Sequence, residues 1–312
     1  MRERHLGWCG NKEAMKSVIV TGASGFVGQW LVKELLKENI KVYAIVRNET
    51  KLEKLADNHF PILCPMEKLD ELNGRLANEG IDTFYHLAWE GSTGEKRADY
   101  NIQLKNVEYS CKAMEVAKNL GCKRFLAAGT ITEQIVDDAI HMETVSPNLM
   151  YGVCKKMTHN ILLTLSKKLD IEFVWMQFSN IFGPGNNTGN LISYTLSAIN
   201  KNENTAYSSA LQPYDFIYIK DLVRAVYLLG KSELKNDVYF IGSGNSRILK
   251  EYLLAIPKAL GLSIEMGIGK RAEDGLVYLP EWFLIDDLKN DTGFEAGYSF
   301  EEAVRETYES FK

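Results

Sequence analysis

Three tyrosines in this 312-residue sequence are followed four positions later by a lysine, a spacing that places both side chains on one face of a helix. The pairs are Tyr151 with Lys155, Tyr227 with Lys231, and Tyr308 with Lys312. A tyrosine with a pKa of about 10 is a poor acid or base at neutral pH, and a nearby ammonium group lowers that pKa. Such a pair can transfer protons, but the spacing alone does not show which of the three does so.

The stretch TGASGFVG places Gly22, Gly25 and Gly28 at regular intervals, directly after a predicted strand and at the start of a predicted helix. Glycines at this spacing allow a tight turn, close backbone approach to a pyrophosphate, and close helix–strand packing. The helix N-terminus adds N–H donors for the phosphates. The alternative is an ordinary glycine-rich turn, but the position in the first βα unit predicts dinucleotide binding.

The second predicted strand ends where the adenosine ribose of a bound dinucleotide would lie. An acidic residue there would bond the 2′-hydroxyl of NAD, whereas this sequence has Arg47. An arginine can pair with the 2′-phosphate of NADP; the alternative is a solvated charge at a strand end. The sequence therefore favours NADP over NAD.

Short apolar runs alternate with segments of helical period, and this alternation predicts the strands and helices that would position these residues. The predicted strands are 17–22, 41–47, 81–89, 122–130, 171–179 and 237–242, and the predicted helices include 26–39, 101–121 and 221–230. Continuous apolar strands separated by helices predict a parallel sheet buried on both faces. The predicted fold class is α/β, a Rossmann-type doubly wound parallel sheet with a smaller, interleaved C-terminal substrate lobe.

Three segments are predicted along the chain. Residues 1–14 are expected to be an N-terminal extension, because the first strand begins near Ser17. Residues 15–182 are expected to form the dinucleotide-binding Rossmann domain, with late elements near 215–245. Residues 183–312 should form mainly the smaller substrate-binding lobe.

Composition narrows the class of protein. A net charge of -5, with acids and bases interspersed, gives no electrostatic reason to expect nucleic acid or an anionic membrane as partner. The five cysteines are odd in number and contain no CxxC, which predicts reduced thiols, no metal site and a cytoplasmic protein. No apolar run approaches the ~18 residues of a membrane span, and the polar N-terminus lacks the apolar core of a signal peptide.

Six motifs, taken in order, resemble the extended short-chain dehydrogenases/reductases of the NAD(P)-dependent epimerase/dehydratase group, which act on nucleotide sugars. They are TGASGFVG, YHLAW (85–89), GT (129–130), YGVCK (151–155), FSNIFGPG (178–185) and DFIYIKDLVRA (215–225). The resemblance covers nearly the whole chain. It also implies a homodimer formed through the helices around 101–121 and 148–168.

The resemblance implies that Thr130, Tyr151 and Lys155 are the catalytic residues. Tyr151 follows both the glycine loop and a strand-end hydroxyl 21 residues upstream, whereas Tyr227 and Tyr308 have no such partner and are interpreted as packing and tail-helix residues. A hydroxyl at Thr130 can hold a sugar oxygen in line with the tyrosine. Its alternative role is to cap the next segment.

Further site residues are implied by the same resemblance. The cofactor-binding set is Gly22, Gly25, Phe26, Val27, Gly28, Arg47, Leu87, Ala88, Tyr151, Lys155 and Phe178. Asn180, with Thr130, would bind the diphosphate or sugar of the substrate, unless it is only a turn former. His86 is interpreted as a buried, hydrogen-bonded histidine rather than a catalytic one.

Two positions depart from the family pattern. Tyr214 stands before Asp215 where the family usually has an arginine, and Gln177 stands where an arginine often begins the sixth-strand motif. The first change removes an expected diphosphate clamp. Lys270 and Arg271 are candidates to replace its charge, although a solvated loop pair is an equal alternative.

The implied reaction is a choice among several. A 4,6-dehydratase carries Asp–Glu directly after the catalytic threonine, and the Ile131–Thr132 found here disfavours dehydration. A 4-keto-(deoxy)sugar reductase, with hydride transfer to C4 and Tyr151 as proton donor, is preferred because Arg47 points to an exchangeable NADP. The alternatives are a nucleotide-sugar 4-epimerase with retained NAD and, third, a non-catalytic NAD(P)-binding regulator.

Overall fold

The computed structural model describes residues 15–49, 54–186, 188–273 and 275–312. The predicted extension, residues 1–14, lies outside the described residues. Within them, seven parallel strands form the central sheet. These strands are β1 (Ser17–Thr21), β2 (Lys41–Val46), β3 (His59–Leu63), β4 (Thr83–His86), β5 (Arg124–Thr130), β6 (Glu172–Phe178) and β10 (Val238–Ile241).

The strand order is β10-β6-β5-β4-β1-β2-β3, so the chain builds outward from β1 in one direction and then from β4 in the other. This order confirms the predicted doubly wound sheet, and its direction changes between β1 and β4. In open parallel sheets the ligand cleft lies at the carboxyl ends of the strands on either side of such a point. The late strand β10 pairs with β6 and returns the C-terminal half to the sheet.

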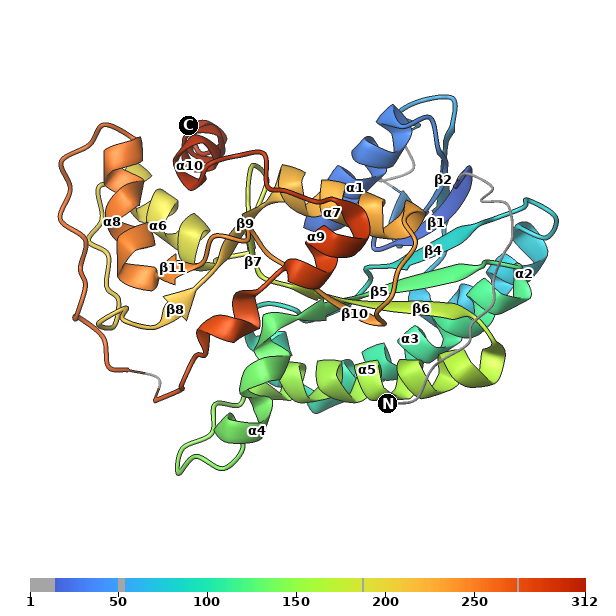
Figure 1. The fold of residues 1–312 in the computed structure, drawn as a ribbon, viewed down its shortest axis with the longest axis horizontal. Coiled ribbons are helices and arrows are strands. Elements are labelled where there is room, and N and C mark those ends of the chain that lie inside the picture. Colours follow the sequence, from blue (N-terminus) through green and yellow to red (C-terminus); the bar gives the residue numbers. More distant parts are fainter. Residues whose placement is uncertain (1–14, 50–53, 187, 274) are drawn as a thin grey trace.

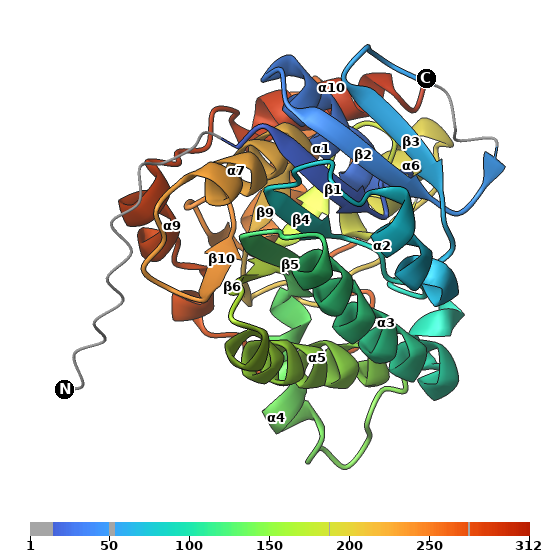
Figure 2. The same ribbon diagram turned by 90° about the vertical axis from the view of Figure 1, so that its right-hand side faces the viewer.

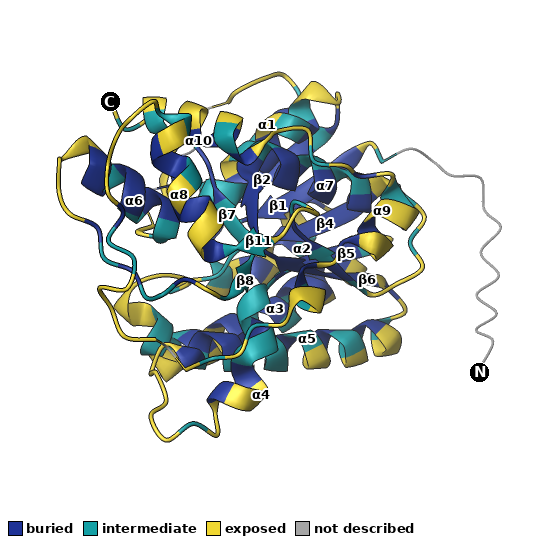
Figure 3. Cartoon of the chain, turned by 60° about the vertical axis from the view of Figure 1, so that its left-hand side comes forward, coloured by how far each residue is buried: buried dark blue, intermediate teal, exposed yellow. Residues whose placement is uncertain are grey.

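Helices cover both faces of the sheet (Figures 1 and 2). One face carries α1 (Phe26–Lys37) and α7 (Ile219–Lys231); the other carries α3 (Tyr100–Asn119) and α5 (Leu149–Leu169). Alternate residues of β1 belong to different cores: Val18 and Val20 pack on the α1 side, and Ile19 on the α3 side. Both faces are thus buried, as the unbroken apolar strands predicted. Figure 3 shows the buried sheet and the exposed outer side of α5.

The remaining elements lie mostly beyond β6. The helices are α6 (Leu191–Asn200), α8 (Leu249–Ala259), α9 (Asp286–Thr292) and α10 (Phe300–Glu309), and two small sheets pair β7 (Asn180–Phe182) with β9 (Phe216–Tyr218) and β8 (Pro213–Tyr214) with β11 (Arg247–Ile248). In Figure 1, α6, α8 and α10 gather at the left end, away from the central strands. The lobe boundary at residues 182 and 183 stays a prediction.

Short helices complete the chain: η2 (Met66–Glu71), α2 (Leu72–Arg75), η3 (Glu95–Ala98), η4 (Ile131–Ile135), α4 (Val136–Ala139) and η5 (Pro280–Phe283). Of these, η3 follows β4 and η4 follows β5, so both stand at the carboxyl edge of the sheet. None of the described helices has a stretch long and apolar enough to cross a bilayer.

Candidate functional site

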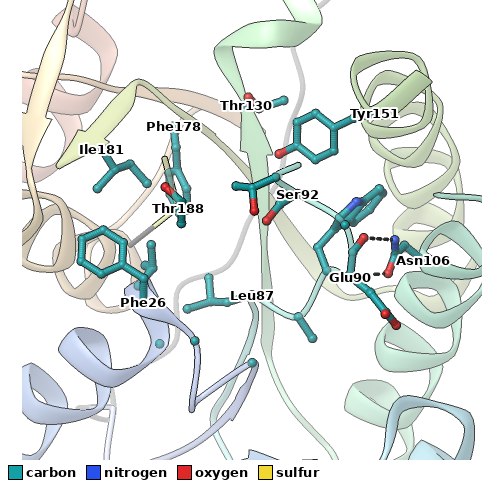
Figure 4. A pocket seen from close by; sticks show the side chains of 18 of the residues that line it. Phe26, Leu87, Glu90, Ser92, Asn106, Thr130, Tyr151, Phe178, Ile181 and Thr188 are labelled. Atoms are coloured by element: carbon teal, nitrogen blue, oxygen red, sulfur yellow. Dashed lines mark hydrogen bonds between the residues drawn. The ribbon is translucent and has the colours of Figure 1, made fainter. Parts of the chain in front are cut away.

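A cavity of about 1180 Å³ opens at the carboxyl ends of β1, β2, β4, β5 and β6. Most of the predicted site residues line it: Gly22, Gly25, Phe26, Val27, Gly28, Arg47, Leu87, Ala88, Thr130, Tyr151, Phe178 and Asn180. Figure 4 shows Thr130 and Tyr151 on one side of this space, with Phe26 and Leu87 across it; Phe178 comes from the strand next to Thr130. Lys155 is the predicted residue that does not line the cavity.

The glycine loop has the geometry that a pyrophosphate requires. Gly22 adopts a φ of 68°, and a Cβ there would lie 2.8 Å from the Ala88 nitrogen. A Cβ on Gly28 would lie 2.1 Å from the Gly22 carbonyl oxygen. Among the described residues, no side chain caps the N-terminus of α1, so its first-turn N–H groups are open to an anion. The residues present therefore fit a dinucleotide.

The segment after β4 is held in place from α3. Trp89 Nε1 donates to Gln103 Oε1 at 2.8 Å, and Gln103 Nε2 donates to the Gly91 and Lys96 carbonyl oxygens, each at 2.9 Å. Asn106 bonds both the N–H and the carbonyl of Glu90, as Figure 4 shows. Buried polar side chains with complete hydrogen bonding fix the surrounding backbone. These hydrogen bonds join this part of the cavity wall to α3.

Tyr151 is 8% exposed and stands among charged and aromatic groups. Burial raises the pKa of Tyr151 to about 12, while the Arg97 charge and a hydrogen bond to Thr130 act to lower it. The Arg97 guanidinium carbon lies 4.3 Å from the centre of the Tyr151 ring. The edge of Trp89 meets the same ring, with the centres 6.0 Å apart. No sequence motif predicts a catalytic or binding role for Arg97 or Trp89.

Lys155 is buried behind the cavity wall rather than exposed in it. Its Nζ donates to the Ala128 carbonyl oxygen at 2.6 Å and lies 3.7 Å from the centre of the Trp89 ring. Burial lowers the pKa of Lys155 to about 7, and the nearby Glu133 carboxylate opposes that change. The expected lowering of the Tyr151 pKa by Lys155 is not found in this arrangement; the cation that lowers it is Arg97.

Glu133 is a buried carboxylate next to Thr130. It accepts hydrogen bonds from the Thr130 backbone N–H at 2.7 Å and from Trp175 Nε1 at 3.0 Å. Thr130 and Glu133 form a capping box at the start of η4, so the predicted capping role of Thr130 coexists with its place in the cavity. The T-x-x-E spacing could have revealed this pair in the sequence. Burial raises the pKa of Glu133.

At the other end of the cavity, the Tyr214 hydroxyl donates to Asn180 Oδ1 at 3.0 Å, and Asn180 Nδ2 donates to the Asp215 carbonyl oxygen at 3.1 Å. Tyr214 thus lies beside the predicted substrate-binding asparagine, and both line the cavity. Lys270 and Arg271 are exposed and lie outside the residues that line it.

Proteins of known activity resemble this chain over most of its length. A dTDP-4-dehydro-6-deoxyglucose reductase from Escherichia coli is 26% identical, covering 80% of this chain and 84% of its own length. A CDP-abequose synthase from Salmonella typhimurium is 28% identical, covering 78% and 80% respectively. The solved structure of a UDP-glucose 4-epimerase from Thermotoga maritima shares the fold, with a TM-score of 0.78, 20% identity, and coverage of 95% of this chain and 98% of its own.

One protein family matches the part of the sequence that forms both the central sheet and the lining of the cavity. It matches residues 18–242, which include every strand of the central sheet except the first residue of β1. The same residues contain the glycine loop, Thr130, Tyr151 and Asn180. From this match, the chain belongs to the NAD dependent epimerase/dehydratase family.

Proposed function

We propose that this protein is an NAD(P)-dependent nucleotide-sugar oxidoreductase that reduces a 4-keto-(deoxy)sugar at C4. The observation that carries the proposal is the meeting of Thr130 and Tyr151 with the glycine loop in one cavity. One relative, a dTDP-4-dehydro-6-deoxyglucose reductase, supports the reduction by its activity, and the CDP-abequose synthase supports a nucleotide-linked sugar as substrate class.

The cofactor would occupy the half of the cavity formed by the glycine loop, with its pyrophosphate at the N-terminus of α1. Arg47 lies at the end of β2, is exposed, and lines the cavity. We assign it to the 2′-phosphate, which makes NADP the preferred cofactor. When bound, the nicotinamide supplies the hydride for C4. Phe178 and Leu87 form the apolar wall of its binding region.

Proton transfer is assigned to the chain itself. Tyr151 donates a proton to the oxygen at C4 as that atom becomes a hydroxyl, and the Thr130 hydroxyl holds the same oxygen in place. Asn180 binds the substrate at the opposite end, with Tyr214 fixing its amide. Lys155 is assigned to the cofactor ribose. To reach it, the ammonium group must leave its present contacts with Ala128 and Trp89. We further propose that residues 183–312 bind most of the substrate. We also propose that the protein forms a homodimer.

The direct test is incubation with a panel of nucleotide sugars and their 4-keto-6-deoxy forms, while NADPH consumption and product identity are followed. Stoichiometric NADPH oxidation with reduction at C4 supports the proposal. Interconversion of C4 epimers without net consumption would replace it by the 4-epimerase alternative. No turnover with any member, despite dinucleotide binding, would favour the regulator.

Tyr151→Phe tests the proton donor. Removal of the hydroxyl should lower kcat by about 100- to 10,000-fold, because general acid–base catalysis contributes that much, while NADPH affinity stays nearly unchanged. The matched control is Tyr227→Phe: Tyr227 has the same spacing from a lysine and receives a hydrogen bond from Lys231 at 3.1 Å, but it does not line the cavity. Full activity of Tyr151→Phe would show that another group donates the proton.

A further inference from the structure

Arg97 lies against the tyrosine that is assigned the proton transfer. Its guanidinium carbon is 4.3 Å from the centre of the Tyr151 ring, and its Nη1 donates to the Ser92 carbonyl oxygen at 3.0 Å. Both Arg97 and Tyr151 line the cavity. No described carboxylate forms an ion pair with Arg97, and Tyr151 is the ionisable group whose charge acts on it. Its positive charge is therefore not neutralised by a structural partner.

The segment that carries Arg97 is not a loose loop. Gln103, which is fully buried in α3, bonds the Lys96 carbonyl oxygen next to Arg97 and the Gly91 carbonyl oxygen. Gly91 has a φ of 69°, and a Cβ there would lie 2.8 Å from the Lys96 carbonyl oxygen. These contacts fold residues 91–97 tightly against α3. The guanidinium itself is held over the ring by its hydrogen bond to the Ser92 carbonyl oxygen.

The other ionisable groups around Tyr151 do not place a positive charge against its ring as Arg97 does. Glu133, from η4, is negative when ionised and acts to raise the pKa of Tyr151. Lys155, from the same helix α5, has its Nζ 5.9 Å from the centre of the Tyr151 ring and donates to Ala128. Burial lowers the pKa of Lys155, and the Glu133 carboxylate opposes that change. His86, from β4, has its pKa lowered to about 3 and is neutral.

We propose that Arg97 is a positioning residue for the reaction: it supplies the positive charge that stabilises the anionic form of Tyr151 as the proton leaves. A cation over the face of an aromatic ring is attracted to the ring, and more strongly once the phenol is ionised. This inference rests on the proposed proton-transfer role of Tyr151. The lysine one helical turn after the tyrosine was expected to lower the pKa of Tyr151. The inference assigns part of this effect to Arg97, which lies in η3.

The direction of the expected effect follows from the charge. An opposite charge within about 4–6 Å lowers the pKa of an acid by roughly 1–3 units, so its removal raises the pKa of Tyr151 by a similar amount. For a reductase, which needs the protonated phenol, the basic limb of the pH–rate profile would move upward. For an epimerase, which first needs the phenolate, the acidic limb would move upward. The direction is the same in both reactions.

The experiment compares the wild type with Arg97→Gln, which removes the charge, and Arg97→Lys, which keeps it. Tyrosine labelled with ¹³C at Cζ reports ionisation by NMR in the NADP-bound protein, and Tyr151→Phe identifies the Tyr151 signal. At a fixed alkaline pH, Arg97→Gln should lower the ionised fraction of Tyr151 by about 10- to 1,000-fold, which corresponds to an upward movement of its titration by about 1–3 pH units. Arg97→Lys should restore most of the change. Arg305→Gln, at an exposed position of α10, is the matched arginine control and should leave the titration unmoved.

The outcomes separate this inference from the function on which it rests. Equal titration of Tyr151 in the wild type and Arg97→Gln would overturn it, as would a rise in KM for the sugar with no movement of the pH–rate profile, which would make Arg97 a substrate-binding residue. The NMR titration needs no turnover. If no nucleotide sugar is converted, the proposed function fails while the charge effect of Arg97 is still measured.

Discussion

Two tyrosines show that the i, i+4 spacing does not by itself bring the lysine into contact with the tyrosine hydroxyl. Lys231 donates directly to the Tyr227 hydroxyl, yet Tyr227 also donates to Glu38 and lies outside the cavity lining. Lys155 has the same spacing from Tyr151 but donates to a backbone carbonyl. The side chains that contact Tyr151 in the cavity wall come instead from other elements, because packing brings Trp89 and Arg97 to its ring.

Arg47 gives a prediction at this scale. Arg47→Asp should weaken NADPH binding by about tenfold or more relative to NADH, because a carboxylate repels the 2′-phosphate that the guanidinium would pair with. Dissociation constants for both cofactors, measured by fluorescence titration, provide the test. Arg305→Asp controls for the change in net charge. If the wild type and Arg47→Asp bound NADH in preference to NADPH to the same degree, the assigned contact between Arg47 and the 2′-phosphate would be ruled out, and NAD would be favoured.

At the scale of elements, the turn between β1 and α1 forms the half of the cavity that we propose for the cofactor. Gly25 N donates to the Gly22 carbonyl oxygen at 2.9 Å, which closes the turn, and Gly28 lets α1 approach it. The edge strand β3 could not be predicted from the pattern of apolar residues. It was not predicted, and its Pro61 argues against a strand, but an edge position tolerates a residue without an N–H.

Gly28→Ala tests the close approach. The new Cβ would meet the Gly22 carbonyl oxygen, so the turn or the helix must shift; we expect the free energy of unfolding to fall by about 1–3 kcal/mol. Dinucleotide affinity should fall as well. Urea denaturation and cofactor titration measure the two effects. Gly74→Ala is the control: a Cβ there meets nothing within 4 Å, and alanine should be neutral or stabilise by up to about 1 kcal/mol. Equal stability of both variants would contradict the packing argument.

Across the whole molecule, burial on both faces of the sheet also neutralises ionisable groups. His86 is 3% exposed, and its ring bonds Thr21 Oγ1 at 2.9 Å and Ser110 Oγ at 3.1 Å. This agrees with its interpretation as a structural histidine. Burial, with a smaller contribution from the Lys155 charge, lowers the pKa of His86 to about 3. The native protein therefore excludes a proton that the unfolded chain accepts below about pH 6.5.

His86→Gln measures this effect. Because the unfolded state binds the proton and the native state does not, the contribution of His86 is complete above about pH 6.5 and is lost as the pH falls toward 3. Between pH 7 and pH 5 the wild type should lose about 2 kcal/mol more unfolding free energy than the glutamine variant. Urea denaturation at both pH values gives the comparison. Parallel losses in the two proteins would mean that His86 is protonated in the native state.

The sequence by itself determined the parts of this protein that depend on local pattern. Unbroken apolar runs predicted the parallel sheet, because such strands must be buried on both faces. The glycine spacing predicted the turn, because Gly22 and Gly28 leave no room for a Cβ. Chain order singled out Tyr151 and Thr130, which the structure brings into one cavity, Thr130 from the carboxyl end of β5 and Tyr151 from the first turn of α5.

Only the tertiary structure decided which charges surround Tyr151. Arg97 lies in a short irregular helix with no periodic signal, and its place depends on hydrogen bonds from Gln103 in α3. Lys155 Nζ donates to the Ala128 carbonyl oxygen and lies over the Trp89 ring, and both of these partners are distant from it in the sequence. Contacts of this kind join residues from separate elements, and their geometry is fixed by packing that no local pattern encodes.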